Sequence, residues 1–135
     1  MSSQIKYTST LAEPLKIITP EFDLFMLEER QVILHSYHFP ISFLDRIRIH
    51  PNTCLIDLDT GHRSPMLQNF NISLAPDWTW MELGRRFEFT LVFAGLPKDC
   101  TRFDMLEDVP DTGRLHIRNI QRSKSDVYYL RMDFD

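Results

Sequence analysis

The clearest alternation of hydrophobic and polar residues in the chain runs from residue 87 to residue 93. Every second position there carries a large apolar side chain: Phe87, Phe89, Leu91 and Phe93. Successive side chains of a β-strand point to opposite faces, so these four residues are predicted to share one buried face. Glu88 and Thr90 lie between them, on the face predicted to meet water.

A second alternating segment follows directly. Gly95 and Pro97 interrupt the first segment, and residues 102–107 then alternate again, with Phe103 and Met105 as apolar positions. Two half-buried strands joined by a short loop containing Gly and Pro are typical of an antiparallel β-sandwich. We therefore predict that residues 102–107 form the partner of the strand at 86–93.

Shorter segments of the same kind occupy most of the remaining chain, and none keeps a helical period over three turns. The further strands that they predict cover residues 16–26, 32–37, 45–49, 53–58, 63–67, 72–74, 115–120 and 127–134. The prediction is an all-β domain, an antiparallel sandwich of about seven to nine short strands.

The chain is predicted to be one domain with a short segment at each end. Its 135 residues match the length of a single domain. Residues 1–15 are mostly polar and are predicted as an N-terminal arm, and residues 16–125 as the β-sandwich. Residues 126–135 place Tyr128, Leu130 and Met132 on one side of an extended chain. Because apolar side chains need cover, this segment is predicted as a C-terminal edge strand or a partner-docking tail.

Composition excludes several classes of protein. With 43% hydrophobic and 25% charged residues, the chain does not belong to the disordered class. A net charge of −4 argues against broad binding to nucleic acid or to anionic membranes. The basic residues between Arg114 and Lys124 are interpreted as a solvated strand face. No segment has the apolar length of a signal peptide or membrane span, so a cytoplasmic location is expected if Met1 is the native start.

The most suggestive catalytic motif is a duplicated Asp-Thr-Gly, at residues 59–61 and 111–113. Aspartic proteases use two such triplets, whose carboxylates share a proton. The two copies here are 52 residues apart (111 − 59 = 52), which leaves no room for a whole lobe between them. The triplet is also ordinary turn chemistry, because Asp bonds to the backbone and Gly adopts a positive φ. We therefore predict turns, with neither Asp59 nor Asp111 catalytic.

No other motif predicts an enzyme, a metal or a cofactor. The segment from Asp57 to Gly61 begins like a calcium loop but lacks the third ligand and the distal Glu. His35 and His38 have a metal-like spacing only on a helix, since in a strand they face opposite sides. Neither a nucleophilic serine elbow nor a Gly-rich phosphate loop is present.

The two cysteines, Cys54 and Cys100, are too few for a disulfide scaffold. Each lies among apolar or small residues, where a free thiol behaves as a small hydrophobic side chain. A single disulfide between them is the alternative.

Two tryptophans are the strongest candidates for a binding surface. Trp78 and Trp80 are alternate residues of one loop, so an extended backbone places both on the same side. Trp is enriched at the energetic centres of interfaces because it offers a large area with a polar handle. The alternative is that one or both cap the open end of the sandwich core.

Residues from about 20 to 120 resemble a small β-sandwich module found in Bacteroidetes proteins. The matching pieces, in chain order, are Val-Ile-Leu-His-Ser-Tyr, Arg-Ile-Arg-Ile, Thr-x-Leu-Ile-Asp with an Asp-Thr-Gly turn, Asn-Ile-Ser-Leu, a Trp-containing loop, Phe-Thr-Leu-Val-Phe-x-x-Leu-Pro-Lys, Phe-Asp-Met-Leu-Glu and Asn119-Ile120. The resemblance implies an immunoglobulin-like fold in a bacterial protein, with no catalytic residues to transfer. It supplies no function, because this fold serves many.

These observations together predict a non-catalytic protein-interaction or assembly module whose partner is another protein or a second copy of the chain. The predicted binding residues are Trp78, Trp80, Tyr128 and Leu130. The alternative is a small-ligand or carbohydrate-binding module that uses the Trp78/Trp80 loop.

Overall fold

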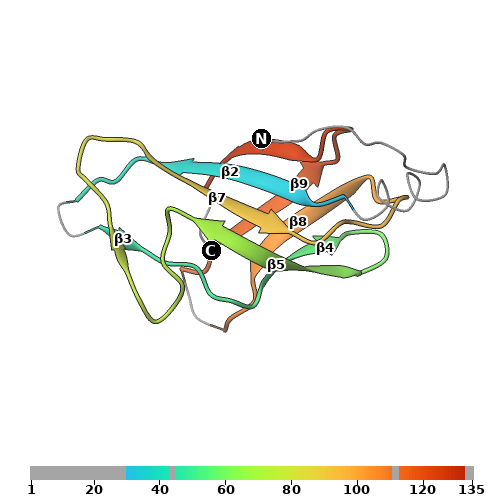
Figure 1. Ribbon diagram of the computed structural model, residues 1–135, viewed down its shortest axis with the longest axis horizontal. Helices are drawn as coiled ribbons and strands as arrows, with labels where there is room; N and C mark the ends of the chain where they lie inside the picture. The colour runs from blue at the N-terminus through green and yellow to red at the C-terminus, as the bar shows by residue number, and fades with distance from the viewer. Residues whose placement is uncertain (1–29, 43–44, 111–112, 133–135) are drawn as a thin grey trace, which may run out of the picture.

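The computed structural model describes residues 30–42, 45–110 and 113–132 (Figure 1). These residues form strands and no helix, which confirms the all-β prediction. The strands are β2 (Val32–His38), β3 (Arg46–Ile47), β4 (Thr53–Asp57), β5 (Arg63–Phe70), β6 (Thr79–Trp80), β7 (Phe87–Phe93), β8 (Arg102–Glu107), β9 (His116–Gln121) and β10 (Val127–Arg131). None of the described segments is a helix that could span a membrane. The predicted arm at 1–15 and strand at 16–26 lie outside the described residues.

Seven strands form one curled sheet in the order β10-β2-β7-β5-β4-β8-β9, and β3 and β6 form a small two-stranded sheet. Neighbours in the large sheet are antiparallel except β10, which runs parallel to β2. The prediction of a purely antiparallel sheet is therefore wrong at this edge. The chain leaves β9 at one edge of the sheet and crosses to the opposite edge, where it meets β2 in the parallel sense.

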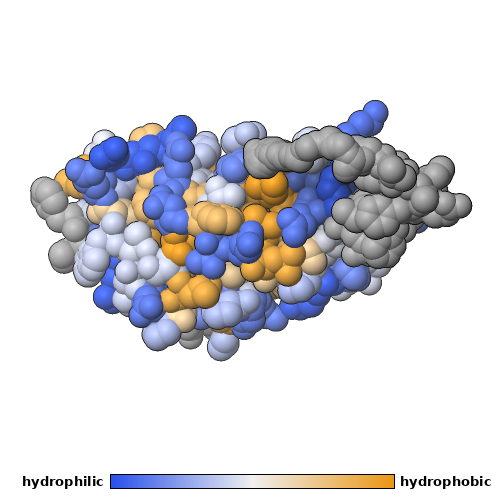
Figure 2. Space-filling model, in the orientation of Figure 1, coloured by the Kyte–Doolittle hydropathy of each residue, from blue (hydrophilic) through white to orange (hydrophobic). Residues whose placement is uncertain are grey.

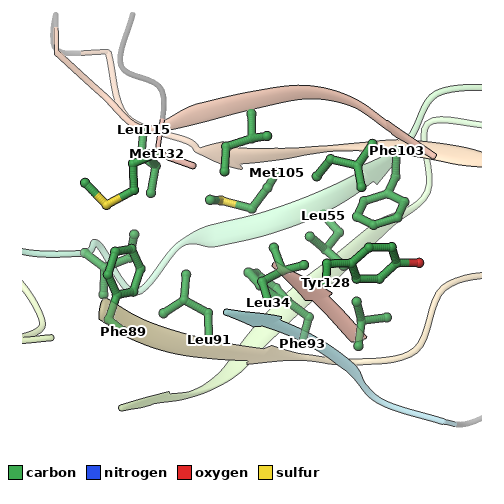
Figure 3. Close-up of a cluster of buried hydrophobic side chains, with 14 of the residues drawn as sticks. Leu34, Leu55, Phe89, Leu91, Phe93, Phe103, Met105, Leu115, Tyr128 and Met132 are labelled. Atoms are coloured by element: carbon green, nitrogen blue, oxygen red, sulfur yellow. The ribbon is translucent and has the colours of Figure 1, made fainter. Parts of the chain in front are cut away.

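The curl brings the two ends of the sheet face to face around one core (Figure 3). Phe103 of β8 and Tyr128 of β10 have ring centres 5.3 Å apart, edge to face, although four strands separate them in the sheet order. Phe89, Leu91 and Phe93 of β7 are buried in this core, as their alternation predicts, and Phe87 packs half-buried at its margin.

The consecutive strands β7 and β8 are not neighbours in the sheet. β7 pairs with β2 and β5, whereas β8 pairs with β4 and β9. The predicted pairing of residues 102–107 with 86–93 is therefore wrong. Each strand presents its large apolar residues to the core, so the two strands contribute facing sides of that core. The loop that connects β7 to β8 passes from one side of the core to the other, and its residues Leu96 and Cys100 are buried there.

The C-terminal segment forms the edge strand β10 within the protein's own sheet. Tyr128 and Met132 are buried and Leu130 packs half-buried against the core, whereas Tyr129 is 77% exposed. This alternation matches the two sides predicted for the segment. Burial of one side explains why the segment is held on β2.

The opposite edge strand, β9, is irregular. Its register with β8 shifts between Phe103 and Met105. At the shift Asn119 adopts a φ of 56°, and its backbone N–H donates to Asp104 Oδ1 at 2.8 Å. A bulge in an edge strand interrupts the row of unpaired backbone groups to which another chain could add.

Candidate binding surfaces

The two tryptophans stack with two arginines on the outer face of the small β3–β6 sheet. The guanidinium carbon of Arg46 lies 4.1 Å from the centre of the Trp78 ring and 5.6 Å from that of Trp80. The guanidinium carbon of Arg48 lies 4.0 Å from the centre of the Trp78 ring. At these distances a cation is attracted to the ring face. We call these four residues the Trp–Arg ladder.

Alternation along two short strands builds the ladder. In the register of the small sheet, Arg46 pairs with Trp80 and Ile47 with Thr79. Ile47 is buried in the core, so the residues beside it face outward. The Thr79 hydroxyl bonds to the Ser73 hydroxyl, with 2.6 Å between the oxygens, on the side away from the rings.

Both tryptophan rings are accessible from solvent. Trp78 is 37% exposed and Trp80 60%, and neither belongs to the buried core cluster. The alternative in which these rings cap the core is therefore wrong. The small sheet lies at one end of the molecule, at the left of Figure 1, where β3 is labelled.

A pocket of about 470 Å³ adjoins the ladder, and Arg46, Arg48, His50 and Glu107 contribute to its lining. The buried Glu107 carboxylate has its own partners inside the fold. Glu107 Oε2 lies 2.7 Å from His50 Nδ1, and Oε1 accepts the backbone N–H of Leu115 at 2.9 Å. This carboxylate is therefore satisfied and is not a counter-ion for the ladder.

A second candidate surface crosses four strands on the outer face of the large sheet. Cross-strand pairing aligns Tyr129 of β10, His35 of β2, Thr90 of β7 and Phe70 of β5 in one line. The rings of Tyr129 and His35 stack with centres 4.9 Å apart, and His35 Nδ1 lies 2.8 Å from Thr90 Oγ1. Phe70 is 50% exposed. We call these four residues the aromatic row.

A shallow groove of about 550 Å³ runs along the aromatic row, and Tyr37, Arg86 and Glu88 also line it. The Arg86 guanidinium lies 4.9 Å from the Tyr37 ring centre and donates to Glu88 Oε2 at 2.7 Å. The two charges compensate each other, so the groove combines exposed rings with hydrogen-bonding groups and little net charge. Figure 2 shows apolar residues gathered among hydrophilic ones over β2, β7 and β5.

The structure separates the four predicted binding residues. Trp78 and Trp80 lie together in the ladder, whereas Tyr128 and Leu130 point inward from β10 against the core. The Tyr128 hydroxyl donates to Asp126 Oδ1 at 3.1 Å and accepts the backbone N–H of Ser123 at 2.9 Å. Burial raises the pKa of this hydroxyl, which therefore stays neutral. Tyr128 and Leu130 are thus part of the fold, and the exposed residues of this strand are Tyr129 and Arg131.

A buried ion pair closes the connection between β9 and β10. Asp126 is fully buried and receives Arg122 in a bidentate contact, with Nε 3.0 Å from Oδ1 and Nη2 3.1 Å from Oδ2. Arg30 Nη2 lies 3.4 Å from Asp126 Oδ2. Arg122 Nη1 also donates to the carbonyl of Pro97 at 2.6 Å. The interpretation of Arg122 as part of a solvated strand face is therefore wrong.

The first Asp-Thr-Gly triplet is a turn, as predicted, and Asp57 organises it. The buried Asp57 carboxylate accepts the Asp59 backbone N–H and the Thr60 hydroxyl, each at 2.9 Å. Gly61 completes the turn with a φ of 78°, a conformation that favours glycine. Burial opposes ionisation of Asp57, but these hydrogen bonds outweigh it and lower its pKa below the ordinary 3.8. Asp111 and Thr112 of the second triplet lie outside the described residues.

The lowered pKa of Asp57 gives stability a defined pH dependence. Replacing Asp57 by Asn is expected to reduce the free energy of unfolding at pH 7 by about 1–3 kcal/mol, the value of hydrogen bonds to a charged group. The folded-state pKa is the lower one, so the contribution is complete above the ordinary, unfolded-state value of 3.8 and is lost as pH falls through the folded value. The measured difference between Asp57→Asn and wild type in urea unfolding should therefore shrink below about pH 4.

Asp59→Asn provides the matched control on the same turn. The Asp59 carboxylate is exposed, and among the described residues it makes a 3.5 Å contact with Arg102 Nη2 and a 3.4 Å contact with the Thr101 hydroxyl. Its replacement is expected to change stability by less than about 1 kcal/mol at every pH. Equal losses for the two variants would contradict the role given to Asp57.

Both cysteines have structural surroundings. Cys54 and Cys100 are buried free thiols, and burial raises the pKa of each. Thiols of this kind are poorly reactive. No group of three or more His, Cys, Asp or Glu side chains in the described part of the chain could hold a metal ion.

Sequence reasoning did not connect Arg46 and Arg48 with the tryptophans, nor the four residues of the aromatic row with one another. The Arg-Ile-Arg-Ile segment signalled that both arginines face outward, but the register of β3 with β6 is a long-range feature. No protein-family model matches the chain, and no curated protein or solved structure matches it either. The resemblance to the Bacteroidetes module stays a prediction based on the matching sequence pieces.

Proposed function

We propose that this protein is a non-catalytic interaction module, that its partner is another protein or a second copy of itself, and that the Trp–Arg ladder is the contact surface. The observation that carries the proposal is that two exposed indole rings stack with two guanidinium groups on one face of a two-stranded sheet. Trp and Arg are the residue types that most often dominate the energy of protein interfaces.

Two further features support this proposal. The rings are already held by stacking, so little side-chain freedom remains to be lost when a partner binds. The three buried carboxylates of the described residues, on Asp57, Glu107 and Asp126, all accept hydrogen bonds within the fold. Carboxylates engaged in this way stabilise the fold and are not poised for acid–base chemistry.

Trp80→Ala is expected to weaken partner binding by about thirtyfold or more, which corresponds to the 2 kcal/mol that defines a hot spot. The measurement is affinity capture from extract of the source cell, followed by titration of the stoichiometric partner. Self-association, measured by sedimentation, would identify the partner as a second copy. Leu67→Ala is the matched control, because Leu67 is a 49% exposed apolar residue outside the ladder. A partner held equally by wild type, Trp78→Ala and Trp80→Ala would contradict the proposal.

A second candidate function is the binding of a carbohydrate or another small neutral ligand. The aromatic row favours it, because the exposed rings of Tyr129 and Phe70 flank hydrogen-bonding groups in a groove of about 550 Å³. Two cations already occupy the Trp78 ring, so the sheet face is better suited to stack a sugar than the Trp loop. Calorimetric titration with an oligosaccharide panel separates the two functions. Heat that disappears in Tyr129→Ala but persists in Trp80→Ala would favour the second.

A further inference from the structure

Arg46 is an arginine whose hydrogen-bond donors are unused. Its guanidinium stacks with both indoles, yet no ion pair or hydrogen bond joins it to another side chain or carbonyl in the described part of the chain. Many other described arginines do have a carboxylate partner: Arg30, Arg63, Arg85, Arg86, Arg102 and Arg122. Arg46, like its ladder neighbour Arg48, is thus positioned by stacking and has no acid partner among the described residues, unlike most of the arginines there.

Stacking leaves the donors of the ladder accessible. The N–H groups of a guanidinium lie in its plane and point outward from its edge, so contact through the face does not consume them. Arg48 uses one of its donors, Nη1, for the carbonyl of Pro76 at 3.2 Å. The edge of Arg46 keeps the forked geometry that matches a carboxylate or a phosphate in a bidentate contact.

No carboxylate of the residues that the structure describes forms an ion pair with the ladder. Asp45, the residue next to Arg46, directs Oδ2 to the backbone N–H groups of Ile41 and Ser42, at 2.7 and 3.3 Å. Asp77, next to Trp78, forms no ion pair with Arg46 or Arg48 in the described residues. The adjoining pocket contains Glu107, which His50 and a backbone N–H already satisfy. The ladder is thus a cationic surface on a protein with a net charge of −4.

We infer that the Trp–Arg ladder binds the side-chain carboxylates of an acidic peptide segment, with Arg46 as the bidentate anchor. This inference rests on the proposed function and names the chemistry of the partner. A glutamate fits the surface because its carboxylate meets the guanidinium edge while its methylene groups contact the exposed Trp80 ring. A nucleic acid is disfavoured, because its closely spaced phosphates would also meet the negative remainder of the protein.

The inference is tested with acetylated, amidated tetraglutamate as the probe and tetraglutamine as its neutral counterpart. Both tryptophans of the chain belong to the ladder, so fluorescence excited selectively at tryptophan, away from the absorption of tyrosine, reports on this surface. At low ionic strength, tetraglutamate is expected to cause a saturable change in fluorescence and tetraglutamine none. Arg46→Gln is expected to weaken the binding about tenfold or more, since a hydrogen-bonded charge pair is lost. Arg46→Lys should restore it only in part, because an ammonium lacks the planar fork.

Arg102→Gln is the matched control, since it removes the same charge from a side chain of β8 that is 47% exposed and paired with Asp59. It should bind tetraglutamate like wild type. Equal binding by wild type and Arg46→Gln, or no response to tetraglutamate, would overturn the inference. Tighter binding of inorganic phosphate than of tetraglutamate would overturn it in favour of a phosphate ligand. A partner whose capture depends on Trp80 but not on Arg46 would sink this inference and leave the proposed function standing.

Discussion

Replacing Phe89 by alanine is expected to lower the free energy of unfolding by about 3–5 kcal/mol, the range for emptying a buried aromatic site. Phe89 is 2% exposed and lies on the core face of β7, with Leu91 and Phe93 beside it on the same face. β7 lies between β2 and β5 in the sheet, and backbone hydrogen bonds hold these two neighbouring strands in place. The strands can therefore close the cavity only in part. Urea unfolding monitored by circular dichroism measures the loss.

Glu88→Ala is the control on the opposite face of the same strand. Its carboxylate pairs with Arg86, and both side chains are more than half exposed. Exposed ion pairs of this kind contribute little, so the expected loss is under about 1 kcal/mol. Similar losses for Phe89→Ala and Glu88→Ala would mean that the facing of β7 is wrong.

Asp126→Ala is expected to lower the free energy of unfolding by about 3–5 kcal/mol, because it leaves a partly buried arginine without its counter-ion. The carboxylate is 0% exposed and contacts Arg122, Arg30 and Tyr128. The hydrogen bond that Arg122 donates to Asp126 is the largest influence that raises the pKa of Arg122. The guanidinium also keeps its charge when Asp126 is removed, because an arginine is not deprotonated in proteins even without such a partner. Thermal and urea unfolding would both show the loss.

Two further variants separate the causes of that loss. Asp126 has a φ of 56°, which Asn tolerates better than Ala. Asp126→Asn therefore removes the charge with less backbone strain, and its loss should lie below that of Asp126→Ala. Asp108→Ala removes an exposed carboxylate that lies 2.7 Å from Arg63, and should lose less than about 1 kcal/mol. A loss from Asp126→Ala as small as that from Asp108→Ala would contradict a structural role for the buried pair.

Local pattern predicted which faces of the strands are buried, and it did so because burial follows a period of two. The core positions of β7, the outward side of Arg46 in β3 and the two sides of β10 all follow from their neighbours in sequence. Which strands pair with each other does not follow from neighbours in sequence. β7 and β8 carry the same pattern whether they pair with each other or face each other, so alternation could not distinguish the two arrangements.

The candidate surfaces were predictable only where they are local. Trp78 and Trp80 are two residues apart, so their common side follows from alternation. Their contact with Arg46 depends on the pairing of β3 with β6. Tyr128 was predicted as a binding residue for a related reason. The sequence does not tell whether a large aromatic residue near a chain end packs against the protein's own core or against a partner. The cover of Tyr128 is Phe103, which lies across the core.

The pairing of β10 with β2 joins the last described strand to the first. Arg30, just before β2, donates to the carbonyl of Lys124, and 94 positions separate the two residues. Until residue 131 has been synthesised, β2 has no β10 beside it, and the apolar face of β7 next to it lacks the cover that Tyr128 brings. Native contacts between such distant residues slow folding and lengthen the time during which strand edges are exposed. We therefore expect the edge of β2 to stay exposed for longer during synthesis than the edge of a strand whose partner is close in sequence.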